Sequence, residues 1–231
     1  MRICGLQKLS MVDYPGKLAA TVFTGGCDLR CPFCHNAPLV THVDAADSYT
    51  EEEVLDFLRS RRGLLDGVVL SGGEPLMHPE AEALLAKMQE LGLAVKLDTN
   101  GCYPELLEKI LDRGLVDYVA MDIKGTPAKY GVITGRPELD LEPVERSIRL
   151  IMDKAPDYEF RTTLVKPFHE VEDMEVIGSW LQGAKRYFLQ TFVDSGDLVG
   201  EGCSGFSPEE MTAFYEAARP WFPQVELRGQ E

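Results

Sequence analysis

The chain has 231 residues, of which 45% are hydrophobic and 26% are charged, a composition typical of a soluble globular domain that excludes wholesale disorder. It contains 23 Lys and Arg against 38 Asp and Glu, and this net charge of −15 argues against a nucleic-acid partner. No run of about 18 apolar residues is present and no apolar stretch precedes Asp13. We therefore expect no membrane span, no membrane partner and no signal peptide, and a cytoplasmic location.

Apolar, β-branched segments alternate along the chain with segments of helical periodicity. The predicted strands are 18–24, 67–71, 93–98, 117–123, 158–165 and 186–192, and the predicted helices are 50–62, 80–91, 104–113, 142–153, 171–182 and 207–218. Strands that alternate with helices form parallel sheets through right-handed crossovers, so the expected fold class is α/β. A closed eight-unit barrel typically needs ~250 residues, so six units predict a partial (β/α)6 barrel, with a flat doubly wound sheet as the alternative.

We expect one domain over residues 1–231, with a lead-in at 1–17, a core at about 18–195 and a C-terminal helix and tail at about 196–231. In either parallel architecture, ligands bind on the loops that follow the carboxyl ends of the strands. These loops are therefore where functional residues are sought.

Three of the six cysteines, Cys27, Cys31 and Cys34, lie directly after the first predicted strand with the spacing C-x3-C-x2-C. In a reducing compartment, cysteines this close together bind metals or take part in catalysis more often than they form disulfides. Thiolates are soft ligands suited to iron–sulfur clusters and to zinc. Three of them can hold three irons of a [4Fe–4S] cluster, and without a fourth local cysteine one iron is open to a substrate.

Four other interpretations of this cluster exist. A Cys3His zinc site could include His35, although structural zinc sites usually take their ligands from two separate pairs. The segment CPFCH at 31–35 matches the c-type haem pattern, which needs export, and a thioredoxin-type dithiol leaves Cys27 unexplained. The density of cysteines argues against a coincidence of buried thiols. Cys4, Cys102 and Cys203 are isolated in the sequence, and we expect them to be ordinary core or surface thiols.

Polar residues also mark the ends of the later strands. They form the segments SGGEP at 71–75, DTNG at 98–101 and DIK at 122–124, and Arg161 lies inside the fifth predicted strand. Taken singly, these are a glycine turn, an Asn-Gly turn and a solvated ion pair, while a charge in a buried strand needs a partner. Independent turns are not expected to align at five consecutive strands, so together they predict one ligand site.

These motifs carry a family resemblance. The three-cysteine spacing, with Phe33 before the last cysteine and GGEP after the second strand, resembles the radical S-adenosylmethionine (SAM) superfamily. The segments DYPG at 13–16, FTGGC at 23–27, CHN at 34–36, DTNG and MDIK at 121–124 resemble activating enzymes of glycyl radical proteins. The resemblance is closest to anaerobic ribonucleoside-triphosphate reductase activating proteins, with pyruvate formate-lyase activating enzymes next, and it covers about residues 1–195.

The resemblance implies an iron–sulfur oxidoreductase in which Cys27, Cys31 and Cys34 hold one [4Fe–4S] cluster, whose open iron chelates SAM. The residues implied to bind SAM are Phe33 and His35 near the adenine, Gly72, Gly73 and Glu74 at the amino group, Asp98 and Asn100 beside the methionine or ribose, Asp122 and Lys124 at the carboxylate, together with a monovalent cation, and Arg161. One electron would cleave SAM to methionine and a 5′-deoxyadenosyl radical, which would take a hydrogen atom from a glycine of a partner enzyme. No catalytic residue is expected beyond the cluster and the cofactor.

Charge is unevenly distributed along the chain. Residues 1–40 have a net charge of +2, and the remaining residues have −17. This distribution predicts that the cysteine segment docks an acidic electron donor, a flavodoxin or ferredoxin, unless a few charges fall there by chance. Two other functions remain open: a radical SAM enzyme acting on a small molecule, and a metal-binding module without catalysis.

Overall fold

The computed structural model describes residues 1–44, 48–194 and 196–229. Its strands are β1 (Ile3–Ser10), β2 (Ala19–Thr24), β3 (Gly67–Gly72), β4 (Ala94–Thr99), β5 (Tyr118–Asp122), β6 (Tyr158–Leu164), β7 (Arg186–Thr191) and β8 (Gln224–Arg228). Its helices are α1 (Ala37–Thr41), α2 (Glu51–Ser60), α3 (Ala81–Glu90), α4 (Pro104–Asp112), α5 (Tyr130–Ile133), α6 (Glu142–Lys154), α7 (Asp173–Trp180) and α8 (Pro208–Ala218), with a 3-10 turn, η1 (Pro75–Met77).

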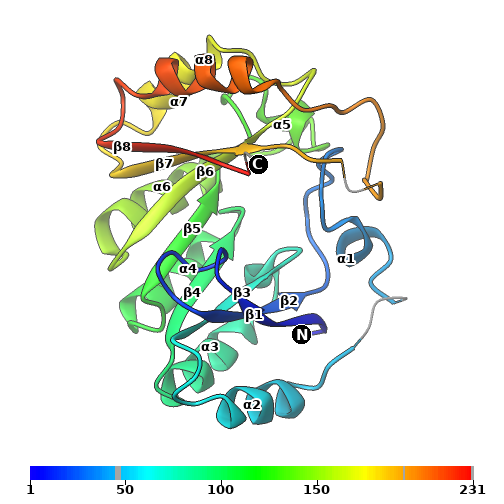
Figure 1. The fold of residues 1–231 in the computed structure, drawn as a ribbon, viewed down its shortest axis with the longest axis vertical. Helices are drawn as coiled ribbons and strands as arrows, with labels where there is room; N and C mark the ends of the chain where they lie inside the picture. Colours follow the sequence, from blue (N-terminus) through cyan, green and yellow to red (C-terminus); the bar gives the residue numbers. More distant parts are fainter. Residues whose placement is uncertain (45–47, 195, 230–231) are drawn as a thin grey trace. The chain divides into compact units, whose positions relative to one another are not determined.

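The strands are hydrogen-bonded in the order in which they occur in the sequence, from β1 to β8 (Figure 1). The pairs β2–β3, β3–β4, β6–β7 and β7–β8 are parallel, and β1 runs antiparallel to β2. The predicted fold class, a partial (β/α)6 barrel of parallel strands, is thus confirmed. All six predicted strands and all six predicted helices are present, with small shifts at their ends.

The structure adds elements that the sequence analysis did not predict. Strand β1 lies in the segment expected to be a lead-in, and β8 lies in the segment expected to be a tail. The short helices α1 and α5 occupy the predicted cysteine loop and the connection before α6. The sheet therefore has one more strand at each end than the six predicted.

The chain divides into two compact units, which are described separately. Unit 1 comprises Met1–Asp28, Pro38–Ala120 and Pro143–Asp157, and unit 2 comprises Leu29–Ala37, Met121–Glu142 and Tyr158–Glu231. The cysteine segment thus contributes to both units, because the boundary falls directly after Asp28.

Unit 1 is built on β2 and β3, whose apolar residues form continuous buried runs. Their register pairs Ala19 with Gly67 and Thr24 with Gly72, so the two strands end at the same level. Helix α3 contacts α2, α4 and β4 (Figure 1). The loops after β2, β3 and β4 consequently leave the same edge of the sheet.

Helix α6 also belongs to unit 1, although residues of unit 2 precede and follow it in the sequence. Arg146 donates to Glu108 at 2.7 Å, and Lys154 donates to both Glu108 and Asp112, at 2.9 and 2.8 Å. These ion pairs join α6 to α4.

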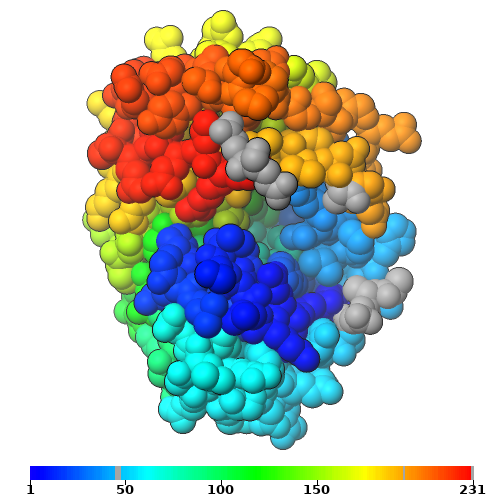
Figure 2. Space-filling view, viewed as in Figure 1, coloured from blue at the N-terminus to red at the C-terminus, as the bar shows by residue number. Residues whose placement is uncertain are grey.

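Unit 2 contains β6, β7 and β8 with helices α7 and α8. Helix α8 begins with the predicted start signal, because the Ser207 hydroxyl accepts from the Glu210 amide and the Glu210 carboxylate accepts from the Ser207 amide. The helix contacts α7, β7 and β8. In Figure 2, α8 is orange and β8 is red.

An ion pair links the C-terminal strand β8 to β6. Arg228 donates two hydrogen bonds to the carboxylate of Glu159, at 2.6 and 2.8 Å, and the Glu159 side chain is fully buried. The guanidinium carbon lies 3.6 Å from the ring centroid of Phe188 on β7. One side chain of β8 therefore reaches across β7 and pairs with β6.

Among the described helices, none combines the length and the apolar character that a membrane crossing requires.

Candidate cofactor site

The first part of the cysteine loop belongs to unit 1 and follows β2. The Gly26 amide donates to the Leu39 carbonyl at 2.7 Å, and the Glu74 amide donates to the Gly26 carbonyl at 2.8 Å. These backbone bonds tie the turn that precedes Cys27 to the turn after β3. Cys27 is half-buried.

The two glycines after β3 allow this close approach. Gly72 has φ +129°, which side chains rarely adopt, and a Cβ there would lie 2.3 Å from backbone atoms of Thr24. A Cβ on Gly73 would lie 1.9 Å from the Gly26 carbonyl oxygen. Gly72 and Gly73 thus let the GGEP turn (Gly72–Pro75) pack directly on the backbone next to Cys27.

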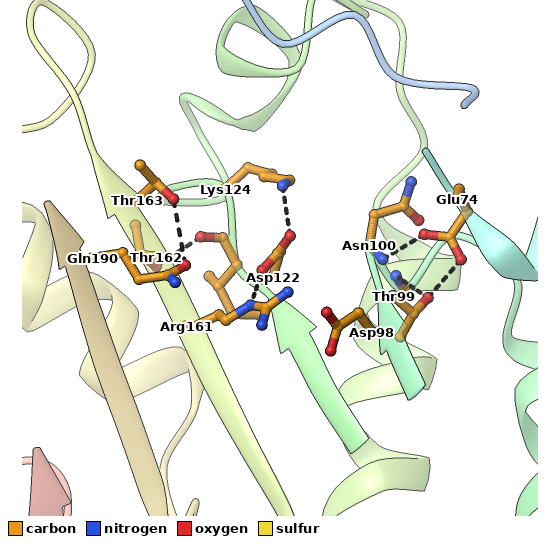
Figure 3. A network of polar contacts seen from close by, with 12 residues as sticks. Glu74, Asp98, Thr99, Asn100, Asp122, Lys124, Arg161, Thr162, Thr163 and Gln190 are labelled. Carbon is orange, nitrogen blue, oxygen red and sulfur yellow. Dashed lines mark hydrogen bonds and ion pairs between the residues drawn. The ribbon is translucent and has the colours of Figure 1, made fainter. Parts of the chain in front are cut away.

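Glu74 joins the GGEP turn to the end of β4 (Figure 3). Its fully buried carboxylate accepts hydrogen bonds from the Leu76 amide at 3.0 Å, the Thr99 hydroxyl at 2.8 Å and the Asn100 amide at 2.6 Å. Burial raises the pKa of Glu74 to about 8, although the hydrogen bonds from Asn100 and Leu76 act in the opposite direction. Both carboxylate oxygens of Glu74 are therefore used to position the turn after β4.

Asp98 and Asn100 occupy that turn. Asp98 accepts from the buried Lys96 ammonium at 2.6 Å and from the Ser71 hydroxyl at 2.9 Å. The Asn100 amide oxygen accepts from the backbone amide of Cys102 at 2.9 Å. Its Nδ2 donates to Asp28 at 3.0 Å and lies 3.8 Å from the Cys27 sulfur.

Cys31 and Cys34 belong to unit 2. The Cys34 amide donates to the Cys31 carbonyl at 3.1 Å, which closes a tight turn between them. Two further backbone bonds hold this part of the loop, from Arg30 to Thr134 at 2.8 Å and from Gly200 to Pro32 at 2.9 Å. Burial raises the pKa of the Cys31 thiol to about 11.

The aromatic residues of the cysteine loop have different surroundings. Phe33 is buried against the rings of Phe168 and His169, at centroid distances of 6.0 and 6.4 Å. His35 is exposed, and its ring meets Phe192 edge-on at 5.4 Å. Partial desolvation of its ring and the positive charge of Lys124 lower the pKa of His35.

A second polar group in unit 2 is centred on Asp122 at the end of β5 (Figure 3). One carboxylate oxygen accepts from Arg161 Nε, and the other accepts from Lys124 Nζ at 3.0 Å. Burial alone would raise the pKa of Asp122, but the charges of Arg161 and Lys124 outweigh it and hold the pKa well below its usual range. The charged partner of Arg161 that its place in a strand demanded is thus Asp122.

The structure assembles the predicted site residues as two groups. Unit 1 holds Cys27, Gly72, Gly73, Glu74, Asp98 and Asn100, and unit 2 holds Cys31, Phe33, Cys34, His35, Asp122, Lys124 and Arg161. Within the described residues, no three His, Cys, Asp or Glu side chains form a ready metal-binding group. The three cysteines of the motif are nevertheless free thiols within eight residues of one another, which is the donor chemistry that an iron–sulfur cluster requires.

Several residues beside these groups were not predicted as site residues. Asp28 and Thr99 lie inside the motifs, but their contacts could not be inferred from spacing. Lys96 is a charged residue in a buried strand, the same signal that singled out Arg161. His169 belongs to no motif, and its Nε2 lies 2.9 Å from the Lys124 carbonyl oxygen. Its position in the loop after β6 is the signal that could have found it.

Comparison with known proteins identifies the class. The model of the Radical SAM superfamily matches residues 21–180, and the chain belongs to this superfamily. The family implies a [4Fe–4S] cluster and SAM as cofactors.

Curated relatives narrow the type. The chain is 35% identical over 198 residues to MJ1227 of Methanocaldococcus jannaschii, proposed to be a glycyl-radical enzyme activating enzyme, which covers 82% of this chain and 79% of that protein. It is 28% identical over 206 residues to the pyruvate formate-lyase-activating enzyme of Clostridium pasteurianum, covering 80% and 85%. These relatives support the glycyl-radical enzyme activating type. Neither is named for a ribonucleotide reductase, so that closer assignment stays a prediction.

Solved structures share the fold. Streptococcus suis SuiB bound to the precursor peptide SuiA superimposes with a TM-score of 0.69 at 15% identity, covering 89% of this chain and 47% of SuiB. The enzyme anSMEcpe with bound AdoMet superimposes with a TM-score of 0.62 at 18% identity, covering 87% and 61%. The chain therefore spans about half the length of SuiB, and at these identities the likeness concerns the fold.

Proposed function

We propose that the protein is a radical SAM activase that reductively cleaves SAM and generates a glycyl radical on a partner enzyme. The observation that carries this proposal is the C-x3-C-x2-C segment directly after β2, in a superfamily member whose relatives include activating enzymes. The proposed partner is an anaerobic ribonucleoside-triphosphate reductase. A pyruvate formate-lyase is the second candidate, favoured by the name of the Clostridium pasteurianum relative.

The residues of the two groups have distinct proposed roles. Cys27, Cys31 and Cys34 hold one [4Fe–4S] cluster, which when bound and reduced supplies the electron that splits SAM into methionine and a 5′-deoxyadenosyl radical. The fully buried Glu74 fixes the turn that carries Asn100. Asp122, Lys124 and Arg161 form a charged group suited to the carboxylate of SAM, with a monovalent cation as an optional further ligand.

The remaining proposed contacts use the loops. Asp98 faces the methionine or ribose part of SAM, and Gly72 and Gly73 offer backbone at its amino group. Phe33 and His35 lie beside the adenine. In this division of labour the cofactor performs the radical chemistry, and the protein orients it and excludes quenching groups.

The proposal is tested anaerobically. Protein reconstituted with iron and sulfide is reduced with dithionite and given SAM, and 5′-deoxyadenosine is quantified. We expect product from the wild type, and none from Cys27→Ala, Cys31→Ala or Cys34→Ala, because each removes one iron ligand. Cys203→Ala is the matched control, since it removes a half-buried thiol outside the motif.

The same assay separates the alternatives. Glycyl radical enzymes encoded beside this protein are then added, and an electron paramagnetic resonance doublet on one of them identifies the partner. Turnover of a small molecule with no protein partner would instead indicate a small-molecule enzyme. Colourless protein that holds one zinc and forms no 5′-deoxyadenosine contradicts the proposal and indicates a metal-binding module.

The electron donor gives a separate prediction. Arg30 is exposed and Lys17 is half-buried, and both belong to the basic N-terminal 40 residues. If an acidic flavodoxin or ferredoxin docks there, changing both residues to Glu slows cluster reduction by the protein donor because it reverses the local charge. Reduction by dithionite should be unchanged, and stopped-flow bleaching of the cluster absorbance measures both rates. Equal slowing with both reductants would refute a docking role.

A further inference from the structure

The side-chain amide of Asn100 has a fixed orientation in unit 1. Its Oδ1 accepts from the Cys102 backbone amide at 2.9 Å, a bond that only the oxygen of the amide can make. The Nδ2 group must therefore face the other way, where it donates to the Asp28 carboxylate at 3.0 Å and lies within 3.8 Å of the Cys27 sulfur. Asn100 thus presents a donor to the first cysteine of the motif.

The backbone of Asn100 is equally constrained. Its amide donates to the buried Glu74 carboxylate at 2.6 Å, which also accepts from Thr99 at 2.8 Å. On the other side of the turn, the Ser147 hydroxyl of α6 donates to the Gly101 carbonyl at 2.7 Å. The donor is consequently held in place from β3, from β4 and from α6.

We propose that Asn100 is a positioning residue that donates a hydrogen bond to the Cys27 thiolate and thereby raises the reduction potential of the cluster. This inference rests on the proposed function, because it needs a cluster bound by Cys27. One-electron reduction adds negative charge that the cluster shares with its thiolates. An N–H dipole aimed at one of these sulfurs stabilises the more negative state, so the reduced form becomes easier to reach.

The experiment is a redox titration of the reconstituted protein without SAM, followed by electron paramagnetic resonance of the reduced cluster. Asn100→Ala removes the donor, and we expect a lower midpoint potential, about a tenfold shift of the reduction equilibrium, or ~59 mV for one electron. Asn100→Asp keeps the shape and the acceptor for the Cys102 amide, so it preserves the turn. It replaces the donor by a carboxylate oxygen, and we expect an equal or larger fall.

Ser147→Ala is the matched control. It removes a hydrogen bond to the same turn but leaves the Asn100 side chain in place, so the potential should match that of the wild type. A wild-type potential in both Asn100 variants overturns the inference, as does a fall in Ser147→Ala equal to that in Asn100→Ala. A wild type that takes up no cluster overturns the proposed function and this inference together, whereas an unshifted potential overturns the inference alone.

Discussion

Gly73→Ala should abolish most of the iron uptake of the reconstituted protein and destabilise it by about 3 kcal/mol. The new Cβ would lie 1.9 Å from the carbonyl oxygen of Gly26 and 2.6 Å from its carbonyl carbon, and both are backbone atoms that no rotamer change can move. The turn that precedes Cys27 must shift, and the amide of Glu74, which bonds the same carbonyl, must shift with it. Iron per chain and urea unfolding measure the two effects.

Gly114→Ala is the control for this prediction. Gly114 has φ +63° and no atom within 4 Å of an added Cβ, so alanine there introduces backbone strain without a collision. We expect it to cost about 1 kcal/mol and to leave iron uptake unchanged. Normal iron uptake in Gly73→Ala would show that the close packing of the two turns is not needed for the site.

Arg228→Ala should lower the free energy of unfolding by about 3–5 kcal/mol, because it leaves the carboxylate of Glu159 buried without its partner. The effect is expected to exceed that of removing an exposed pair such as Arg59–Asp56, which is worth under about 1 kcal/mol. Urea unfolding followed by circular dichroism gives the values.

A double variant distinguishes a buried charge from lost packing. Glu159→Met combined with Arg228→Met removes both charges and keeps apolar volume, and such replacements of buried pairs are often neutral. We expect the double variant to recover most of the stability that Arg228→Ala loses. If Arg228→Ala unfolds like the wild type, β8 does not depend on this pair.

The six inner strands could be predicted because buried parallel strands appear as continuous apolar runs, such as GVVL in β3. Strands β1 and β8 are the outermost in the strand order, and they lack such runs. Residues 7–9 of β1 are exposed, and β8 contains only five residues, none of them fully buried. Helices α1 and α5 have five and four residues, too few to show a helical period.

The position of the candidate site was predictable for a different reason. The carboxyl ends of parallel strands meet at one edge, so the order of motifs along the chain indicates which turns are neighbours. The pairings inside the site were not predictable. Nothing in the sequence distinguishes the Glu74 carboxylate as a buried acceptor for Thr99 and Asn100 from a ligand-facing acid, because those three contacts cross from one strand to the next.

The discontinuous composition of unit 1 has a consequence for synthesis on the ribosome. Strands β1 to β4 and helix α4 emerge first, yet Arg146 and Lys154, which neutralise Glu108, and Ser147, which holds the Gly101 carbonyl, are added only with α6. Until then the nascent unit has an uncovered α4 surface and an unsupported DTNG turn. A newly made chain can therefore complete the Asn100 side of its site only after residue 154 has left the exit tunnel, although Cys27 emerged more than a hundred residues earlier.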